Sequence, residues 1–468
     1  MSNEPERRPV AFPSLFDEPE VPTRVPHTAA SWLGHRVVRP AWLWRREIAV
    51  VLAPVVVGAI PWVVRGAPLA DLARLGGGIA LAGLLGGVLS LVPRLRSGVG
   101  RWLSEGRLRR KWDMACRFSR LQTDALRIPR ITETEHAGAG TRVTVRLPKG
   151  LSTDDLTAAS EKLAVVLDVR ETRVKRDPAR AKYPTVLVLD HNPFHDERGP
   201  VRLASPVADA ARWSLWDGVP VGLDELGKWS TLRLVGRNLL LGGEPEAGKS
   251  VALGTALAAA ALDPMARLSG LDAKQVELAL WEPVMGGGVV YNDIDAAIDL
   301  LGGLIAEMDR RYDQLAQLGI RSVSRSLGWL VEVLTIDELR FFTAHPDKQK
   351  RTAFNLLLID LVARGRAAGI IVLAATQKPS SDVVPTSVRD LFAYRWALRC
   401  TTRDASDTIL GAGWATEGYS AGVIDAIDRG VGLLLAEGGM PEFTKAAYLD
   451  DDAIRRVVTR GVGLREVV

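Results

Sequence analysis

The sequence predicts an α/β protein with a mainly parallel sheet, preceded by a small α+β domain and an N-terminal pair of membrane-spanning helices. Three observations predict this order. Two long uncharged segments lie before residue 95, strand-like alternation begins at residue 141, and a glycine-rich loop separates an apolar run from an alanine-rich run further on. At 468 residues the chain is long enough for two or three domains.

The composition is that of an ordinary folded protein. Apolar residues make up 47% of the chain and charged residues 25%, which argues against global disorder. There are 60 Lys and Arg against 55 Asp and Glu, and a basic cluster runs from Arg94 to Lys111. Such a cluster can face anionic lipid, nucleic acid or only solvent. The two cysteines and six scattered histidines form no disulfide or zinc-binding pattern, and they fit a reducing cytoplasm.

The two uncharged segments predict a transmembrane hairpin over residues 46–95. Its spans cover residues 48–64 and 75–93, close to the ~20 residues that cross a bilayer core. A pair of buried helices in a soluble core is the alternative interpretation, and the flanking charges argue against it. Arginines precede the first span and the basic cluster follows the second, so the positive-inside rule places both ends in the cytoplasm. We therefore expect a multi-pass protein of the cell membrane, with the domains that follow the hairpin in the cytoplasm.

The segments around the hairpin are predicted from composition. Residues 1–45 begin with a stretch rich in Pro and Glu that lacks apolar periodicity, and we expect a disordered cytoplasmic tail. Residues 96–140 are predicted to form a basic helical stalk. At the other end of the chain, residues 451–468 are predicted to be a C-terminal tail.

A small α+β domain is expected over residues 141–200. Val143, Val145 and Leu147 alternate with polar residues, which is typical of a half-buried strand. Ser152 or Thr153 can then cap a helix whose first turn is acidic. Nothing in this segment suggests catalysis, so a structural or oligomerisation role is the interpretation we give it.

The glycine-rich loop is a phosphate-binding motif in the context that this motif requires. It follows a predicted buried strand at Leu239–Leu241 and precedes an alanine-rich helix at Val251–Leu262. The loop amides and the helix N-terminus would surround phosphates, Lys249 would reach the β and γ phosphates, and Ser250 would bind Mg²⁺. Two acids in the loop are unusual, and we expect their side chains to point outward. The predicted ATP-binding residues are Gly243, Glu244, Pro245, Glu246, Ala247, Gly248, Lys249 and Ser250.

A second part of the same site is predicted further along the chain. Residues 330–336 form an apolar-dominated run that predicts a buried strand, and the strand ends in Asp337 and Glu338. In phosphoryl transfer such a pair serves to hold Mg²⁺ through water and to polarise the attacking water. The two motifs together predict a P-loop ATPase that uses ATP and Mg²⁺, in a motor domain over residues 201–450.

Several further segments resemble one family when they are taken in order. Asp272–Leu278 resembles a D-x-K-x-x-E-L stretch, Glu307–Tyr312 an E-M-x-x-R-Y helix, and Gly319–Ser322 the turn after it. Arg364–Ile370 and Ala375–Pro379 resemble the R-A-x-G-I-H-L-x-x-A-T-Q-R-P signature. Together they resemble the FtsK/SpoIIIE motors, which are RecA-like ATPases that pump double-stranded DNA. The order of two membrane spans, a small domain and an ATPase domain most resembles that of actinobacterial transfer proteins of conjugative plasmids and integrated elements.

The resemblance implies roles for two further residues. Gln377, expected at the tip of a strand, would sense the γ-phosphate, and Arg395 would be an arginine finger that reaches the ATP of a neighbouring subunit. A finger acting in trans implies an oligomer, and the family implies a homo-hexamer. Lys378 and Ile371 depart from the family pattern, which has arginine and histidine there. An ordinary salt bridge is the alternative role for Arg395.

The cargo is left open between two classes. The resemblance implies double-stranded DNA, moved during conjugation or during the partition of chromosomes or plasmids. A protein-secretion motor of the EccC type shares the signature and also begins with two spans. Such motors usually carry two or three ATPase modules, whereas this sequence has a single P-loop. Loop residues that could grip DNA phosphates are Arg321, Arg325, Lys378 and Arg389, and each can equally be an ordinary solvated charge.

Overall fold

The computed structural model describes residues 93–466, apart from residue 178 and the segments 197–198 and 378–385. Both predicted transmembrane spans, except for Pro93, and the predicted N-terminal tail therefore lie outside the described residues. Among the described helices, none combines the length and apolar character needed to cross a bilayer. The chain divides into two units, the first ending at Phe118 and the second beginning at Ser119.

In the first unit the structure describes one helix, α5 (Pro93–Phe118). It matches the first half of the predicted basic stalk. The second half of that prediction is corrected, because residues 130–137 form an edge strand of the small domain instead. Only Ile131 is buried in this strand, and its other side chains are polar or partly exposed. An edge strand of this kind lacks the apolar alternation by which a strand is recognised in a sequence.

The small domain is a four-stranded antiparallel sheet with two short helices. The predicted alternation is confirmed, since Val143, Val145 and Leu147 are all buried. Ser152 caps the first helix, and its side chain and the Asp155 carboxylate exchange hydrogen bonds with each other's backbone N–H groups. The strands lie in the order β1-β2-β4-β3. The elements are β1 (Arg130–Ala137), β2 (Gly140–Arg146), α6 (Thr153–Ala158), α7 (Ser160–Leu167), β3 (Glu171–Lys175) and β4 (Thr185–Leu189).

The motor domain contains a ten-stranded mixed sheet, which confirms the predicted α/β class with a mainly parallel sheet. The first six strands, counted from one edge, pair in parallel, and the remaining neighbours pair antiparallel. In spatial order they are β11 (Val289–Tyr291), β10 (Ala266–Asp272), β12 (Val331–Asp337), β13 (Ile370–Thr376), β9 (Leu239–Gly242), β14 (Tyr394–Leu398), β15 (Val431–Ala436), β16 (Glu442–Ala446), β7 (Val219–Asp224) and β8 (Trp229–Leu232). A two-stranded ladder, β5 (His195–Asp196) and β6 (Gly199–Pro200), precedes them.

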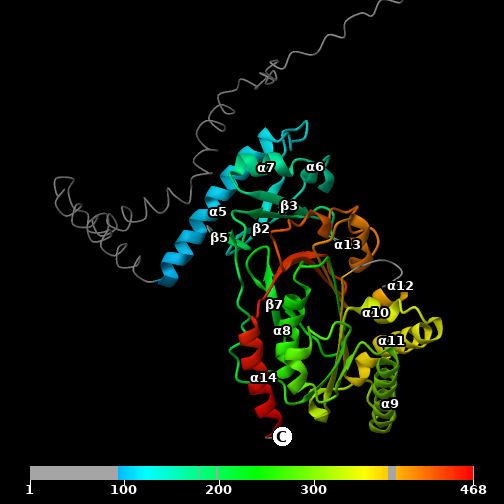
Figure 1. The fold of residues 1–468 in the computed structure, drawn as a ribbon. Helices are drawn as coiled ribbons and strands as arrows, with labels where there is room; N and C mark the ends of the chain where they lie inside the picture. The colour runs from blue at the N-terminus through cyan, green and yellow to red at the C-terminus, as the bar shows by residue number, and fades with distance from the viewer. Residues whose placement is uncertain (1–92, 178, 197–198, 378–385, 467–468) are drawn as a thin grey trace, which may run out of the picture. The chain divides into compact units, whose positions relative to one another are not determined.

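Helices cover both faces of this sheet (Figure 1). One layer contains α8 and α14, and the opposite layer contains α9, α10 and α11. The longer helices are α8 (Lys249–Ala261), α9 (Ile294–Leu318), α11 (Lys348–Ala368) and α14 (Asp451–Glu466). The shorter ones are α10 (Leu339–Thr343), α12 (Thr386–Arg389), α13 (Arg403–Leu410) and the 3₁₀ turns Ala279–Val284, Arg325–Leu327 and Ala421–Val423.

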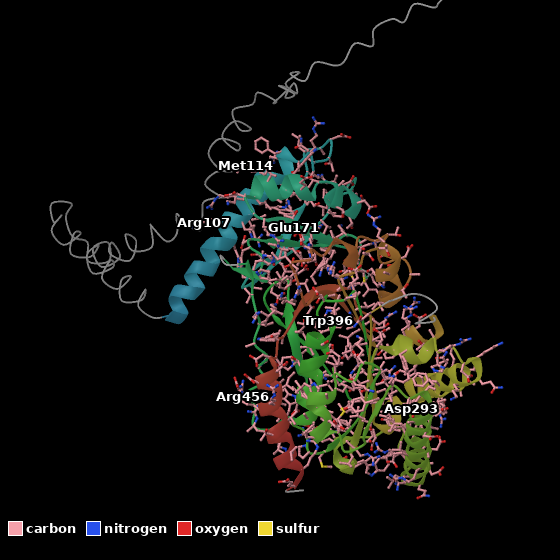
Figure 2. The ribbon with its side chains drawn as sticks, in the orientation of Figure 1. Arg107, Met114, Glu171, Asp293, Trp396 and Arg456 are labelled. Atoms are coloured by element: carbon pink, nitrogen blue, oxygen red, sulfur yellow. The ribbon has the colours of Figure 1, made fainter. Side chains whose placement is uncertain are left out.

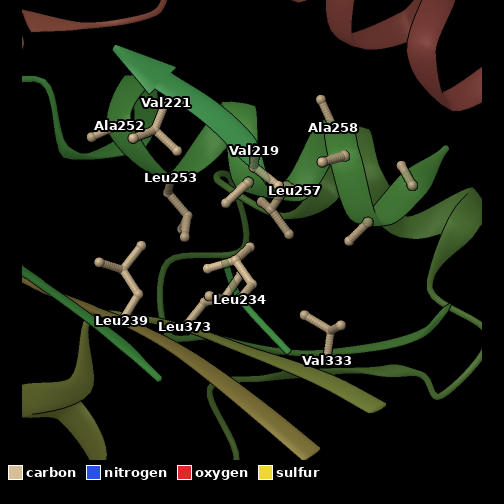
Figure 3. Close-up of a cluster of buried hydrophobic side chains, with 14 of the residues drawn as sticks. Val219, Val221, Leu234, Leu239, Ala252, Leu253, Leu257, Ala258, Val333 and Leu373 are labelled. Atoms are coloured by element: carbon tan, nitrogen blue, oxygen red, sulfur yellow. The ribbon is translucent and has the colours of Figure 1, made fainter. Parts of the chain in front are cut away.

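The central strands are buried on both faces, which explains their continuous apolar sequences. Leu239 of β9 and Leu373 of β13 point into the core beneath α8, where they meet Leu253 and Leu257 (Figure 3). Leu240 points into the opposite core. Trp396 is fully buried in the motor, whereas the side chain of Arg456 points outward from α14 (Figure 2).

The predicted C-terminal tail is corrected, because most of it forms helix α14. Val457 and Val458 are buried, and Gly461 packs so closely on α8 that an added Cβ would lie 2.5 Å from the Ala261 carbonyl oxygen. The Arg465 guanidinium donates hydrogen bonds to carbonyl oxygens at the end of α8, including those of Ala260 and Ala261. Two glycines and several β-branched residues give this segment a weak helix propensity, so tertiary contacts stabilise the helix.

A buried ion pair joins α9 to the sheet. The Arg311 side chain is 3% exposed, and its Nη2 donates to Glu332 Oε1 on β12 at 2.9 Å. Its Nε also donates to Glu307 at 2.6 Å, and its Nη1 donates to the Ala368 carbonyl oxygen at 2.8 Å. Arg311 therefore connects α9, β12 and the end of α11 in one network.

We predict that Arg311→Met lowers the melting temperature by on the order of 10 °C, because it leaves the Glu332 carboxylate buried with Arg267 as its remaining partner. Arg310→Met is the matched control, since Arg310 binds the same Glu307 from an exposed position. It should change the melting temperature by about 1 °C or less. Equal melting temperatures for the two variants, measured by differential scanning fluorimetry, would contradict the structural role of Arg311.

Candidate active site

Three adjacent parallel strands bring the predicted motifs together. The strands β12, β13 and β9 are neighbours in the sheet and run in the same direction, so their carboxyl ends meet at one edge. The glycine-rich loop follows β9, Asp337 ends β12, and Gln377 follows β13. Ligands of open parallel sheets bind outside these carboxyl ends.

The glycine-rich loop is held in a conformation that its glycines permit. Gly248 has a φ of 98°, and an added Cβ would lie 2.6 Å from the backbone nitrogen of Gly430. A side chain at residue 248 would therefore be strained and would also clash with the neighbouring loop. The N–H of Gly430 donates to the Ala247 carbonyl oxygen at 2.8 Å, which fixes the two loops against each other.

Lys249 is buried at the start of α8, and its ammonium lies over the loop. It donates to the carbonyl oxygens of Gly243 at 2.8 Å and Glu244 at 2.6 Å. Burial lowers the pKa of Lys249 to about 8, although the carboxylates of Glu338 and Asp337 favour its charged form. The first amides of α8 have no carbonyl partner within the helix, so the helix N-terminus favours an anion.

The two acids in the loop are each neutralised by an arginine. Glu244 pairs with Arg399 at 2.9 Å, and Glu246 pairs with Arg429 at 2.7 Å. The Glu246 pair is exposed, with both side chains about 70% accessible, whereas the Glu244 pair is partly buried. The expectation that both acids point outward is therefore met by Glu246 and only in part by Glu244.

Asp337 is an acid whose charge is poorly compensated. Its side chain is buried at the end of β12, and Oδ2 has no hydrogen-bond partner among the described residues. Burial raises the pKa of Asp337 to about 7, against the effect of the Lys274 ammonium, and the nearby Glu277, Asp272 and Glu338 add to the rise.

Glu338 is fixed by the end of the neighbouring strand. Its Oε1 accepts hydrogen bonds from the Thr376 hydroxyl at 3.2 Å and from the Gln377 N–H at 3.3 Å. The backbone of Glu338 is left-handed, with a φ of 56°, which costs of order 1 kcal/mol or more in a residue other than glycine. This conformation turns the chain sharply after Asp337, so that consecutive acids lie at the same strand end.

Lys274 also lies at this site, and the sequence predicted no role for it. Its Nζ lies 3.9 Å from both Asp337 Oδ2 and Glu338 Oε2. Asp272 builds the turn that places it, because the Asp272 carboxylate accepts the N–H groups of Lys274, Gln275 and Leu278. The D-x-K-x-x-E-L stretch is thus a structural turn that carries a cation to the acidic pair.

A cavity of about 490 Å³ lies beside the P-loop lysine. Its wall includes Lys249, Ser250, Gln377 and Glu277, which supports the predicted placement of Gln377 near the nucleotide. Three further cations line it that no motif indicated, because they come from segments distant in the sequence: Arg202, Arg429 and Lys445. A cavity with this charge suits a polyphosphate.

The residues at this edge of the sheet fit a bound Mg²⁺. Among the described residues, no three His, Cys, Asp or Glu side chains converge to hold a metal by themselves. The unpartnered Oδ2 of Asp337 and the excess of carboxylates around it are what a divalent cation would neutralise, together with phosphate oxygens. Ser250 and Asp337 are the residues that would hold it.

Arg395 lies away from this cavity, on β14. Its Nη1 is 3.4 Å from Asp390 Oδ1, its side chain is 20% exposed, and its Nε has no hydrogen-bond partner among the described residues. Burial lowers the pKa of Arg395, and the Asp390 carboxylate opposes this effect. Within its own chain, Arg395 therefore contacts no residue of the nucleotide site described above, and the finger role stays a prediction.

The loop cations considered for DNA differ in their accessibility. Arg321 is exposed, Arg325 pairs with Asp217 at 3.4 Å, and Arg389 is buried and pairs with Asp390. Lys378 lies outside the described residues. Burial and pairing make Arg389 the least suited of these to grip a phosphate.

We predict that the metal-free protein loses stability through Asp337 as the pH rises from about 4 to 7. The folded state holds the Asp337 proton up to about pH 7, whereas the ordinary pKa of aspartate is 3.8, so ionisation in this window disfavours folding. Asp337→Asn should raise the melting temperature in EDTA by on the order of 5 °C at pH 8 and hardly at pH 5. A difference between variant and wild type that does not change with pH would contradict the raised pKa.

Comparisons with known proteins agree with this site. Residues 197–431 match the FtsK/SpoIIIE family, and residues 104–180 match the N-terminal domain of actinomycete conjugal transfer proteins. The DNA translocase FtsK of Listeria monocytogenes is 25% identical over 369 residues, which cover 70% of this chain and 44% of that protein. The DNA translocase SftA of Bacillus subtilis is 29% identical over 237 residues, which cover 47% of this chain and 23% of that protein. The chain thus spans less than half the length of these relatives.

Solved structures with a similar arrangement were also found. The pCW3 conjugation coupling protein TcpA, solved with ATPγS, has a TM-score of 0.49 and 18% identity, covering 75% of this chain and 98% of that one. The cytoplasmic domain of the Thermomonospora curvata secretion ATPase EccC has a TM-score of 0.43 and 22% identity, covering 58% of this chain and 33% of that one. The family match spans half of the sequence and contains the P-loop, Asp337, Glu338 and Gln377, so the chain belongs to the FtsK/SpoIIIE family of P-loop ATPases.

Proposed function

We propose that the chain is a membrane-anchored, ATP-driven translocase of double-stranded DNA that serves conjugative transfer or the partition of chromosomes or plasmids. The observation that carries the motor part is the convergence of Lys249, Asp337 and Glu338 at adjacent strand ends. Glu338 is fixed there by the backbone N–H of Gln377. A rigid scaffold thus holds the phosphate-binding lysine, the proposed metal-binding carboxylate and the proposed base of one subunit in place.

Each residue has a separate task in this mechanism. Lys249 and the first amides of α8 bind the phosphates of ATP. Ser250 and Asp337 would hold Mg²⁺, which would offset the charge of the phosphate oxygens. Glu338 accepts a proton from the attacking water, and its two hydrogen bonds aim the carboxylate. Gln377 lines the cavity beside Lys249 and Ser250, where its side chain can distinguish a bound γ-phosphate from its absence.

The choice of DNA as cargo is supported by the relatives, which carry the name DNA translocase. The match of residues 104–180 to a conjugal transfer domain supports a role in conjugation. Secretion of proteins by an EccC-like system is the competing function, and the experiment below separates the two.

Anchoring and assembly complete the proposal. The two uncharged segments with arginines at their flanks support a membrane hairpin, with the motor in the cytoplasm. A ring of six subunits would place Arg395 of one subunit near the ATP of the next, as the family resemblance implies. Hydrolysis at such an interface changes its charge and so can move loops that hold DNA.

We predict that the purified full chain hydrolyses ATP several-fold faster with duplex DNA than without it. Glu338→Gln should lower the rate by about 10²–10⁴ while ATPγS still binds, because the variant lacks the base but keeps the phosphate contacts. The measurement is phosphate release with duplex DNA, single-stranded DNA or a candidate secreted peptide. Stimulation by the peptide and none by duplex DNA would replace the DNA pump with the secretion motor.

We predict that Arg395→Ala lowers ATP turnover by about 10³ or more without loss of nucleotide binding. Oligomers mixed from Arg395→Ala and Lys249→Ala subunits should regain part of the activity, since an intact P-loop then meets an intact finger. Asp390→Asn is the matched control, because it removes the intrachain partner of Arg395 but keeps the guanidinium. If the control loses as much activity as Arg395→Ala, or if mixing restores none, Arg395 is a structural residue.

A further inference from the structure

A second charged site lies in the small domain, away from the nucleotide cavity. A cavity of about 420 Å³ lies at the open end of the β1-β2 hairpin, where β1 begins and β2 ends. Its wall contains no acid, hydroxyl, amide or aromatic side chain. We call it the basic cavity, and its five cations are Arg127, Arg130, Arg146, Lys149 and Lys182.

The folded chain itself brings these cations together. Arg130 begins β1 and Arg146 ends β2, and the two are direct cross-strand partners in the register. Like charges directly opposite each other destabilise a sheet. The N–H of Leu147 donates to the carbonyl oxygen of Lys182 at 2.9 Å, which brings the loop of Lys182 to the same hairpin end.

The charges of the basic cavity are not neutralised within the described part of the chain. All five side chains are exposed, and none lies within the ion-pair distance of 4.0 Å from a described acid. Elsewhere in the same sheet the cations are paired, as Arg142 is with Glu135 at 3.2 Å and Lys175 with Glu225 at 3.2 Å. The sheet therefore keeps one cluster of repelling charges free of counter-charges.

We propose that the basic cavity binds the phosphate backbone of double-stranded DNA. Arg and Lys side chains donate hydrogen bonds to phosphate oxygens, and such contacts position a duplex without reading its sequence. Single strands are held by stacking on aromatic side chains, and the cavity has none. The inference rests on the proposed function and adds to it a sequence-independent contact outside the ATPase domain.

An anionic membrane surface is the competing ligand. Amphipathic helices that dock on membranes bury apolar side chains beside their basic residues. The apolar residues of the cavity wall do not suit this, because Leu147 is buried and Ile128 and Pro148 are half-buried. Leu126, exposed just before Arg127, is a single apolar side chain. These features favour DNA over lipid.

The test uses the full chain in nanodiscs of neutral phosphatidylcholine and a fluorescent duplex without sequence preference. Arg130→Gln/Arg146→Gln should weaken duplex binding by on the order of tenfold and lower the slope of log affinity against log salt by about 2. Basal ATPase should not change. The melting temperature should be equal to that of the wild type or higher, because the variant relieves the repulsion across β1 and β2.

A control removes the same charge from another part of the domain. Lys162 and Arg176 are exposed, form no ion pair with a described acid, and lie outside the basic cavity. Lys162→Gln/Arg176→Gln should bind the duplex like the wild type.

Equal affinity and salt slope in the two double variants would overturn the inference while leaving the DNA pump intact. Failure of the wild type itself to bind duplex DNA would overturn both. If Arg130→Gln/Arg146→Gln keeps its duplex affinity but loses binding to phosphatidylserine nanodiscs, the cavity is a membrane contact and the inference is wrong.

Discussion

The active site depends on a buried carboxylate that the described part of its own chain leaves without a hydrogen-bond partner on one oxygen. Asp337 has an unpartnered oxygen, neighbours of like charge, and one ammonium at 3.9 Å. Keeping such a group out of water costs free energy, which the surrounding packing must offset. The strands that carry the site are therefore buried on both faces, with leucines of β9 and β13 packed under α8. The packing of these strands thus holds Asp337 in place with its Oδ2 unpartnered among the described residues.

A short loop links this site to the small domain. Gly430 contacts the P-loop so closely that Gly248 has no space for a side chain, and Arg429 pairs with Glu246. Next to them, the Asp428 carboxylate is hydrogen-bonded to His195, which precedes the motor sheet. A displacement of this loop would alter contacts on both sides at once. The loop thus contacts the P-loop on one side and the segment between the two domains on the other.

The sequence predicted the parts that follow from periodicity and from short motifs. The central strands, Ser152 as a cap, and the P-loop in its strand–helix context are local patterns, and the structure confirms them. The edge strand β1 and helix α14 were missed because their contacts come from distant residues and not from their own sequences. Arg202, Arg429 and Lys445 are far apart in the sequence and come together at the cavity only in the folded chain. Their spacing along the chain therefore could not predict that they line it.

Two of the stretches that resemble the family have mainly structural roles. Arg311 of the E-M-x-x-R-Y stretch pins α9 to β12, and Asp272 of the D-x-K-x-x-E-L stretch shapes a turn. Contacts within the protein explain both residue types without any contact to the nucleotide. The buried carboxylate of Glu332 is paired with the Arg311 guanidinium, and the Asp272 carboxylate accepts the backbone N–H groups of its turn. Lys274 is the exception, since the turn delivers its charge to Asp337 and Glu338. A motif recognised as one unit thus divides into a residue that builds the turn and a residue that acts on the site.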